Sequence, residues 1–127
     1  MSEDATVALV RALVENMEGA ADDWESLSFV LALNDARLYE VYGYTYNADE
    51  SISAVVVRAR LVRPQLADYF EGYYGEDESR PVRLLVQLVR ATGTYEITFE
   101  DTDDSRWAVT ADNLATIREE LRPQLDA

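Results

Sequence analysis

The chain has 127 residues, and nearly half of them are apolar, which suits one compact domain with a hydrophobic core. It contains 25 acidic residues and 11 basic ones, all of them Arg, so its formal net charge at pH 7 is −14. It has neither Cys nor His, which excludes disulfides, thiol chemistry, Cys/His zinc sites and imidazole general bases. An enzyme of this composition would depend on carboxylates, Tyr, Ser, Thr or Arg, and a bound metal would be a hard ion such as Mg²⁺ or Ca²⁺.

The negative charge limits the partners that such a protein can have. It repels the phosphates of nucleic acid and attracts a basic protein. A compositional bias of the host, for example a salt-loving one, would produce the same acidity, and the sequence does not separate the two explanations. The apolar runs are far shorter than the roughly 18 residues of a membrane span, and the acidic start "MSEDATVALV" is unlike a signal peptide. We therefore expect a cytoplasmic protein with neither nucleic acid nor a membrane as partner.

The first 46 residues predict a helix followed by a β-hairpin. In residues 4–18, apolar side chains recur at helical spacing, with Val7, Val10 and Val14 on one face. Residues 25–33 alternate apolar and polar side chains with the period of a strand, and residues 37–46 form a second, Tyr-rich strand. Because the connection between them is short, the two strands are expected to pair antiparallel.

The middle of the chain contains one ambiguous segment. Residues 52–62 alternate in a way that favours a third strand, and a helix remains the alternative. Pro64 fits the first turn of a helix over residues 64–74, because a proline there removes no hydrogen bond that the helix needs.

The last third predicts a second hairpin and a final helix. Strands over residues 82–90 and 94–100 turn at Gly93, and Thr110 caps a helix over residues 111–122. The order α-β-β-β-α-β-β-α with mostly short connections indicates a single α+β domain, residues 1–127. We expect a mainly antiparallel five-stranded sheet with the helices packed on one face.

The stretch "YEITFEDTDDSRW" gathers carboxylates after the last strand and is a candidate calcium loop. Aligned from Asp101, however, its sixth position is Arg106 where the sharp turn needs Gly. Its twelfth position is Asp112 instead of the bidentate Glu. The pattern therefore predicts no metal site.

The same stretch is a poor candidate for catalysis. Glu96 and Glu100 share one strand face roughly 13 Å apart by strand rise, which exceeds the separation of a glycosidase pair. There is no G-x-S-x-G elbow and no Gly-rich phosphate loop. We therefore predict a non-catalytic protein without a cofactor, and a carboxylate enzyme is the weakest hypothesis.

Three alternating tyrosines suggest an interface. Tyr42, Tyr44 and Tyr46 share one face of the second strand with Glu40. They could simply belong to the core, with their hydroxyl groups at its edge. If the helices cover the other face of the sheet, this face is an exposed Tyr-and-acid surface, and Tyr is favoured at interfaces.

Several landmarks, in chain order, resemble the YezG-like immunity and antitoxin proteins. These are an initial amphipathic helix, the acidic setting of Trp24 in "ADDWESLSFVLAL", and the aromatic strand end "YEVYGYTY". The hairpin and acidic tail "VRLLVQLVRATGTYEITFEDTDD" follow. The positions of that segment that match the family pattern are Thr92, Gly93, Tyr95, Phe99, Asp101, Asp103 and Asp104. The middle helix is shorter than the family pattern, and the last helix has no counterpart there, so secretion-chaperone-like folds remain the main competitor.

The resemblance implies an immunity protein, that is, a stoichiometric inhibitor of a toxin such as a nuclease with a basic cleft. An acidic surface would imitate nucleic acid and fill that cleft. The residues expected to contact the partner are Glu96, Glu100, Asp101, Asp103 and Asp104, with Trp107, Tyr42 and Tyr44 as anchors. The alternative is a secretion-chaperone-like or regulatory module that binds another protein. An exposed strand edge would also permit a homodimer.

Overall fold

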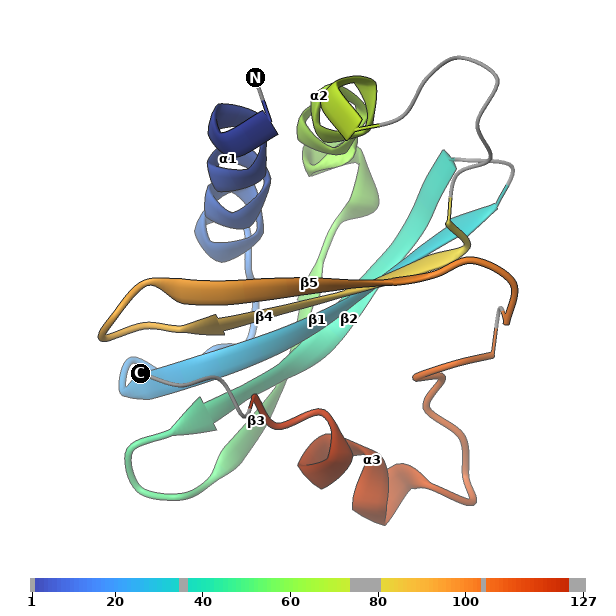
Figure 1. Ribbon diagram of the computed structural model, residues 1–127. Helices are drawn as coiled ribbons and strands as arrows, with labels where there is room; N and C mark the ends of the chain where they lie inside the picture. Colours follow the sequence, from blue (N-terminus) through green and yellow to red (C-terminus); the bar gives the residue numbers. More distant parts are fainter. Residues whose placement is uncertain (1, 35–36, 74–80, 104, 124–127) are drawn as a thin grey trace.

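The structure, a computed structural model, describes residues 2–34, 37–73, 81–103 and 105–123. These residues form three α-helices and five strands in the predicted order, which confirms the α+β class (Figure 1). The elements are α1 (Ser2–Glu15), β1 (Trp24–Asn34), β2 (Arg37–Asn47), β3 (Ile52–Val57), α2 (Arg63–Tyr73), β4 (Arg83–Val89), β5 (Thr94–Glu100) and α3 (Leu114–Glu120).

The strands form one antiparallel sheet in the order β3-β2-β1-β4-β5. The two predicted hairpins, β1–β2 and β4–β5, are both present, and β1 joins them by pairing with β4. β1 is therefore the central strand, and β3 and β5 are the two edges of the sheet.

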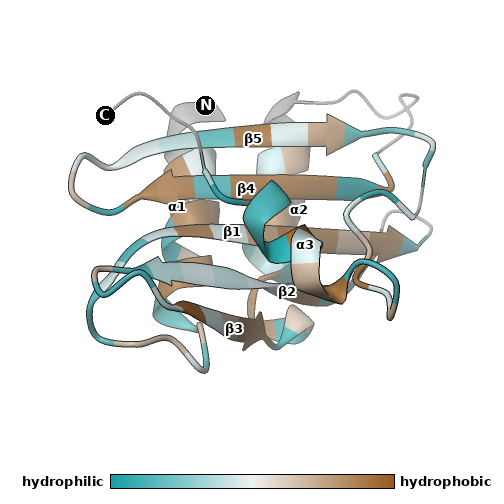
Figure 2. Ribbon diagram, turned by 90° about the horizontal axis from the view of Figure 1, so that it is seen from below, coloured by the Kyte–Doolittle hydropathy of each residue, from teal (hydrophilic) through white to brown (hydrophobic). Residues whose placement is uncertain are grey.

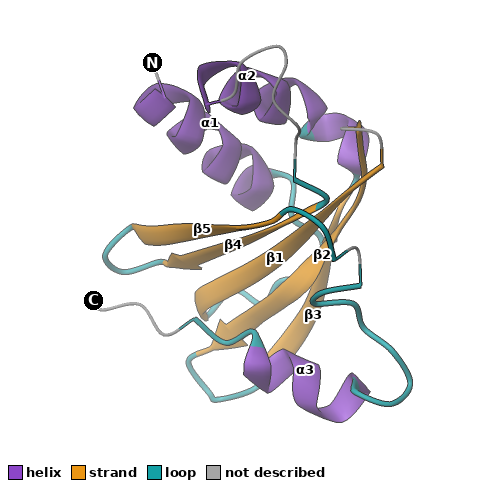
Figure 3. Ribbon diagram, turned by 45° about the vertical axis from the view of Figure 1, so that its right-hand side comes forward, coloured by secondary structure: helices purple, strands orange, loops and turns teal. Residues whose placement is uncertain are grey.

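The helices lie on both faces of the sheet, so the prediction that they share one face is wrong for α3. α1 and α2 pack side by side on one face, and α3 crosses the other (Figures 1 and 3). The reason is that the central strands carry apolar side chains on both faces. Val30, Tyr44 and Leu85 point away from α1 and α2, and Ile117 and Leu121 cover them. A strand with two apolar faces needs a layer on each side.

The larger core lies between the sheet and the helices α1 and α2. Leu9 and Leu13 of α1 are completely or almost completely buried there against β-strand side chains such as Phe29. The apolar face of α1 is therefore rotated from the predicted one, and Val7 is 40% exposed. None of the helices in the described ranges is long and apolar enough to cross a membrane.

The ambiguous segment 52–62 contains two different secondary-structure elements in succession. Its first half is strand β3, as the alternation favours, and a 3-10 helix follows at Ala59–Leu61. The outer edge of β3 is paired at Val56 by Glu18, whose backbone N and O bond the O and N of Val56 at 2.9 and 3.1 Å. Gly19, at φ +100°, makes this approach feasible, because a Cβ there would lie 2.8 Å from the Ala54 carbonyl oxygen.

Gly43 marks a close approach of β1 and β2 that the sequence analysis missed. A Cβ at this position would lie 1.9 Å from the carbonyl oxygen of Ser28, so only Gly fits. The Cα of Phe29, its partner in the ladder, would lie 2.9 Å from the same Cβ.

Helix α3 begins three residues later than predicted. Thr110 and Asn113 bond reciprocally: the Thr110 hydroxyl accepts from the Asn113 N–H at 3.3 Å, and Asn113 Oδ1 accepts from the Thr110 N–H at 2.7 Å. The predicted capping role of Thr110 is therefore carried out in the turn before the helix, and Asn113 holds the N-cap position.

Candidate interaction surface

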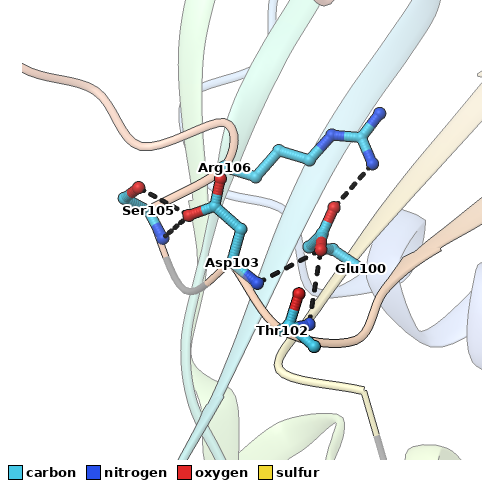
Figure 4. Close-up of polar contacts among 5 residues, drawn as sticks. All are labelled: Glu100, Thr102, Asp103, Ser105 and Arg106. Carbon is cyan, nitrogen blue, oxygen red and sulfur yellow. Dashed lines mark hydrogen bonds and ion pairs between the residues drawn. The ribbon is translucent and has the colours of Figure 1, made fainter.

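The loop after β5 is folded around the carboxylate of Glu100 (Figure 4). Its Oε2 accepts from the backbone N–H groups of Thr102 and Asp103 at 3.3 and 3.1 Å, and Arg106 Nη1 donates to its Oε1 at 2.7 Å. The side chain of Glu100 is only 16% exposed. The bond from Arg106, supported by the two amides, lowers the pKa of this carboxyl.

Asp103 stabilises the next turn of the same loop. Its Oδ1 accepts from the backbone N–H of Ser105 at 3.0 Å and from the Ser105 hydroxyl at 2.7 Å (Figure 4). These bonds lower the pKa of Asp103. Glu100 and Asp103, both predicted to contact a partner, therefore hold the loop in shape and have much of their hydrogen-bonding capacity occupied.

Two other predicted acids are exposed, one on β5 and one at the start of this loop. Glu96 on β5 and Asp101 just after the strand are both exposed, and neither carboxylate forms a hydrogen bond or an ion pair with any residue of the described ranges. Asp104 lies outside the described residues. Of the predicted acids that the structure describes, Glu96 and Asp101 are thus the ones available to a partner.

Trp107 attaches the loop to the sheet. Its indole lies under the Arg106 guanidinium, 4.4 Å from the ring centroid, and its carbonyl oxygen accepts a 2.8 Å bond from the Tyr42 hydroxyl. It adopts a positive φ of 64°, which is uncommon for a bulky residue. The ring is half-buried against the core beneath α3. In this structure, Trp107 thus connects the loop to the sheet through contacts within the protein.

The expected open Tyr-and-acid face is not present, because α3 covers it. Tyr44 is 8% exposed and Tyr46 is 2% exposed. Tyr42 is half-buried, and its hydroxyl also accepts a 2.9 Å bond from Arg83. Burial raises the pKa of Tyr42, and Arg83 opposes this. The expectation that Tyr44 anchors a partner is therefore corrected: Tyr44 belongs to the core.

A groove that the sequence analysis missed runs between α1 and the β4–β5 hairpin. Its volume is about 340 Å³. Its lining is mainly apolar and consists of Val7, Val10, Val14, Leu88, Gly93 and Tyr95, together with Arg11 and Glu15. The signal in the sequence was the surplus of apolar positions around α1, which are more than one buried face can accommodate.

A second hollow, of about 640 Å³, separates β3 from α3. It is lined by Ile52 and Ala54 of β3 and by Leu114, Ala115 and Arg118 of α3. Leu114 is 59% exposed there.

Within the part of the chain that the structure describes, no three Asp or Glu side chains converge as ligands for a metal ion. The predicted absence of a metal and of catalysis stays a prediction. No protein-family model matches the chain, and no curated protein sequence matches it. The resemblance to YezG-like proteins likewise stays a prediction.

Proposed function

We propose that the protein is a non-catalytic acidic binding protein, an immunity protein that neutralises a toxin by occluding its basic site. The observation that carries this proposal is the loop folded around Glu100, which includes the exposed Asp101 and follows the strand that carries the exposed Glu96. A loop that is already held by its own hydrogen bonds loses little conformational freedom when a partner binds. Asp101 is thus presented by a preorganised loop, and Glu96 by a strand of the sheet.

The negative charges of the protein act both at long range, before contact, and at short range, within the complex. The net charge of −14 steers a basic domain toward the protein and speeds the encounter. At contact, Glu96 and Asp101 pair with Arg or Lys of the toxin. Glu100, Asp103 and Trp107 act as positioning residues that keep the loop in shape.

Co-expression with the protein encoded beside it tests the proposal. Cells that produce the neighbouring toxin are expected to survive only when this protein is present, and the two purified proteins are expected to form a salt-sensitive complex. If folded protein gives neither rescue nor a complex, the proposal is wrong.

Matched charge reversals test the site. The double change Glu96→Lys with Asp101→Lys is expected to weaken the complex and flatten its salt dependence. The control double change, Asp68→Lys with Glu120→Lys, alters the net charge equally at exposed positions of α2 and α3. It is expected to leave binding closer to that of the wild type. Equal effects of the two doubles would mean that only the total charge matters.

A second candidate is a chaperone-like or regulatory module, and the apolar groove between α1 and the β4–β5 hairpin favours it. Such a module would bind an unfolded segment of its client, whereas an immunity protein binds a folded toxin domain. Limited proteolysis of the partner in the complex separates the two: a folded, protease-resistant partner supports immunity.

A further inference from the structure

The two edges of the sheet differ in whether their backbone is already paired. The outer side of β3 is occupied at Val56 by Glu18. β5 is the last strand at the other edge (Figure 2), and among the described residues no backbone hydrogen bond closes its outer side. An unpaired edge is a template for a further strand.

The hydrogen-bond pattern identifies which groups of β5 face outward. Arg90 N bonds Glu25 O at 2.8 Å and Leu33 N bonds Val82 O at 2.9 Å, so even-numbered residues of β4 turn their backbone groups toward β1. Odd-numbered residues of β4 therefore turn toward β5. Because backbone groups alternate along an antiparallel ladder, Tyr95 and Ile97 of β5 direct their N–H and C=O groups to the outside.

The two sides of this edge have opposite chemistry. Toward α1, the edge borders the apolar groove, where Val7 is 40% and Tyr95 is 37% exposed. On the opposite face of β5, the side chain of Glu96 is exposed, and its carboxylate bonds no side chain or backbone group of the described residues. α3 lies over the central strands of that face, and β5 is at the margin beyond it (Figure 2).

We infer that the outer edge of β5 accepts an extended strand of a protein partner in which apolar residues alternate with Arg or Lys. The backbone of that strand pairs with Tyr95 and Ile97, its apolar side chains enter the groove beside α1, and its basic side chains face Glu96. Side chains of a strand point alternately to the two faces of a sheet, so this alternation is what the edge selects. The inference rests on the proposed function as an acidic binding protein and specifies how the partner is held.

Charge argues against a second copy of this chain as the occupant. Pairing two copies would bring two chains of charge −14 together, with Glu96 of each beside the same edge. A basic strand relieves that repulsion, and a second copy increases it.

Synthetic peptides test the inference with the protein unchanged. The probe is a fluorescently labelled peptide of alternating Val and Lys with the seven-residue length of β5. Its comparison is a block peptide of the same composition, with all Val before all Lys. At low salt, fluorescence anisotropy is expected to show about tenfold tighter binding of the alternating peptide, which matches the free energy of a few hydrogen bonds and side-chain contacts.

Backbone methylation separates strand pairing from charge attraction. Two further alternating peptides carry N-methyl groups on all Val amides or on all Lys amides. In a bound strand, one of these sets points at β5 and the other points away. One methylated peptide is therefore expected to lose about tenfold in affinity and the other to bind nearly as the parent does.

Variants of the protein locate the binding. Glu96→Lys and Val7→Asp are each expected to weaken the alternating peptide severalfold, whereas Glu120→Lys, an equal change of charge on α3, leaves it nearly unaffected. Amide hydrogen exchange of Tyr95 and Ile97 is expected to slow when the peptide is bound.

The outcomes distinguish this inference from the proposed function. Equal binding of all peptides, or a native dimer paired through β5 in sedimentation and cross-linking, would overturn strand addition and leave an acidic toxin inhibitor in place. No peptide binding by a protein that still rescues cells would do the same. Selective binding of the alternating peptide without rescue from the toxin would support strand addition and overturn the immunity role.

Discussion

The two faces of the sheet hold their helices by different means. On the α1 and α2 face, a large apolar cluster includes residues such as Leu13, Phe29 and Val86 that are buried completely or nearly so, and Arg63 Nε of α2 adds a 2.8 Å bond to the Leu38 carbonyl oxygen. On the α3 face, the buried apolar cluster is small, and its centre is Val30 with Ile117 and Leu121. A helix of seven residues has too little surface to be held by burial alone.

Hydrogen bonds from the sheet complete the attachment of α3. The Ser28 hydroxyl and Gln87 Nε2 both donate to the Leu121 carbonyl oxygen, and the Tyr46 hydroxyl donates to the Arg118 carbonyl oxygen at 2.6 Å. Arg118 belongs to the last turn of the helix and Leu121 is its C-cap residue, so neither carbonyl has an intrahelical partner. The sheet thus caps the helix that covers it, so a short helix whose apolar face is small is held in addition through its C-terminal end.

The largest expected effect is on the α1 and α2 face. Phe29→Ala removes a fully buried ring opposite Gly43 and is expected to destabilise the protein by about 3–5 kcal/mol, because it loses apolar burial and leaves a cavity. Urea unfolding followed by circular dichroism measures this. The control Val56→Ala, at a residue that is 51% exposed, is expected to change stability by less than about 1 kcal/mol. Equal losses of stability in the two variants would contradict the difference in burial between Phe29 and Val56.

A smaller loss is expected on the α3 face. Leu121→Ala is expected to cost about 2–3 kcal/mol, the low end for a buried Leu, because a short terminal helix can relax around the gap. Amide hydrogen exchange is the sharper measurement. It should show α3 opening before the β1–β4 ladder does, and simultaneous opening would mean that the two faces form one cooperative unit.

Tyr46→Phe tests the polar part of that attachment. Loss of the bond to the Arg118 carbonyl oxygen is expected to cost about 1 kcal/mol at neutral pH. Burial raises the pKa of Tyr46, so the fold favours the neutral phenol. That contribution is complete below the unfolded pKa of about 10 and is lost as the pH rises above it. Unfolding measured from pH 7 to 11 is therefore expected to show the difference between wild type and variant shrinking at alkaline pH, and a constant difference would contradict this.

The smallest effect on stability is expected in the loop after β5, which is folded around Glu100. The pKa of Glu100 is lowered chiefly by its bond to Arg106, so its contribution is present above the unfolded pKa of about 4.5 and is lost as the pH falls. Glu100→Gln is expected to lower the unfolding midpoint slightly at pH 6 and hardly at all at pH 3. Gln at this position can still accept from the two amides, so the variant isolates the pairing with Arg106. A midpoint difference that grows on acidification would show that Glu100 has the opposite role.

The candidate site was predictable only in part. Because side chains alternate along a strand, the sequence correctly placed Ile97 and Phe99 toward the core and left Glu96 on the opposite face. It did not reveal that Glu100 and Asp103 are used to fold their own loop, since that depends on turns whose backbone N–H groups converge on a carboxylate. Nor did it reveal the groove beside α1, which depends on how the helix is rotated against β4 and β5.

By itself, the sequence determined the two hairpins, the Gly93 turn, the order of the elements and a chemistry without Cys or His. Periodicity and turn residues are local, and these features depend on little else. Only the tertiary structure decided that α3 covers the tyrosine face, that Glu18 pairs with Val56 at the β3 edge, and that no other described segment pairs with the outer side of β5. Alternation tells which side chains of a strand share a face. It does not tell which distant segment will cover that face, because contacts such as that of Ser28 with Leu121 join residues 93 positions apart.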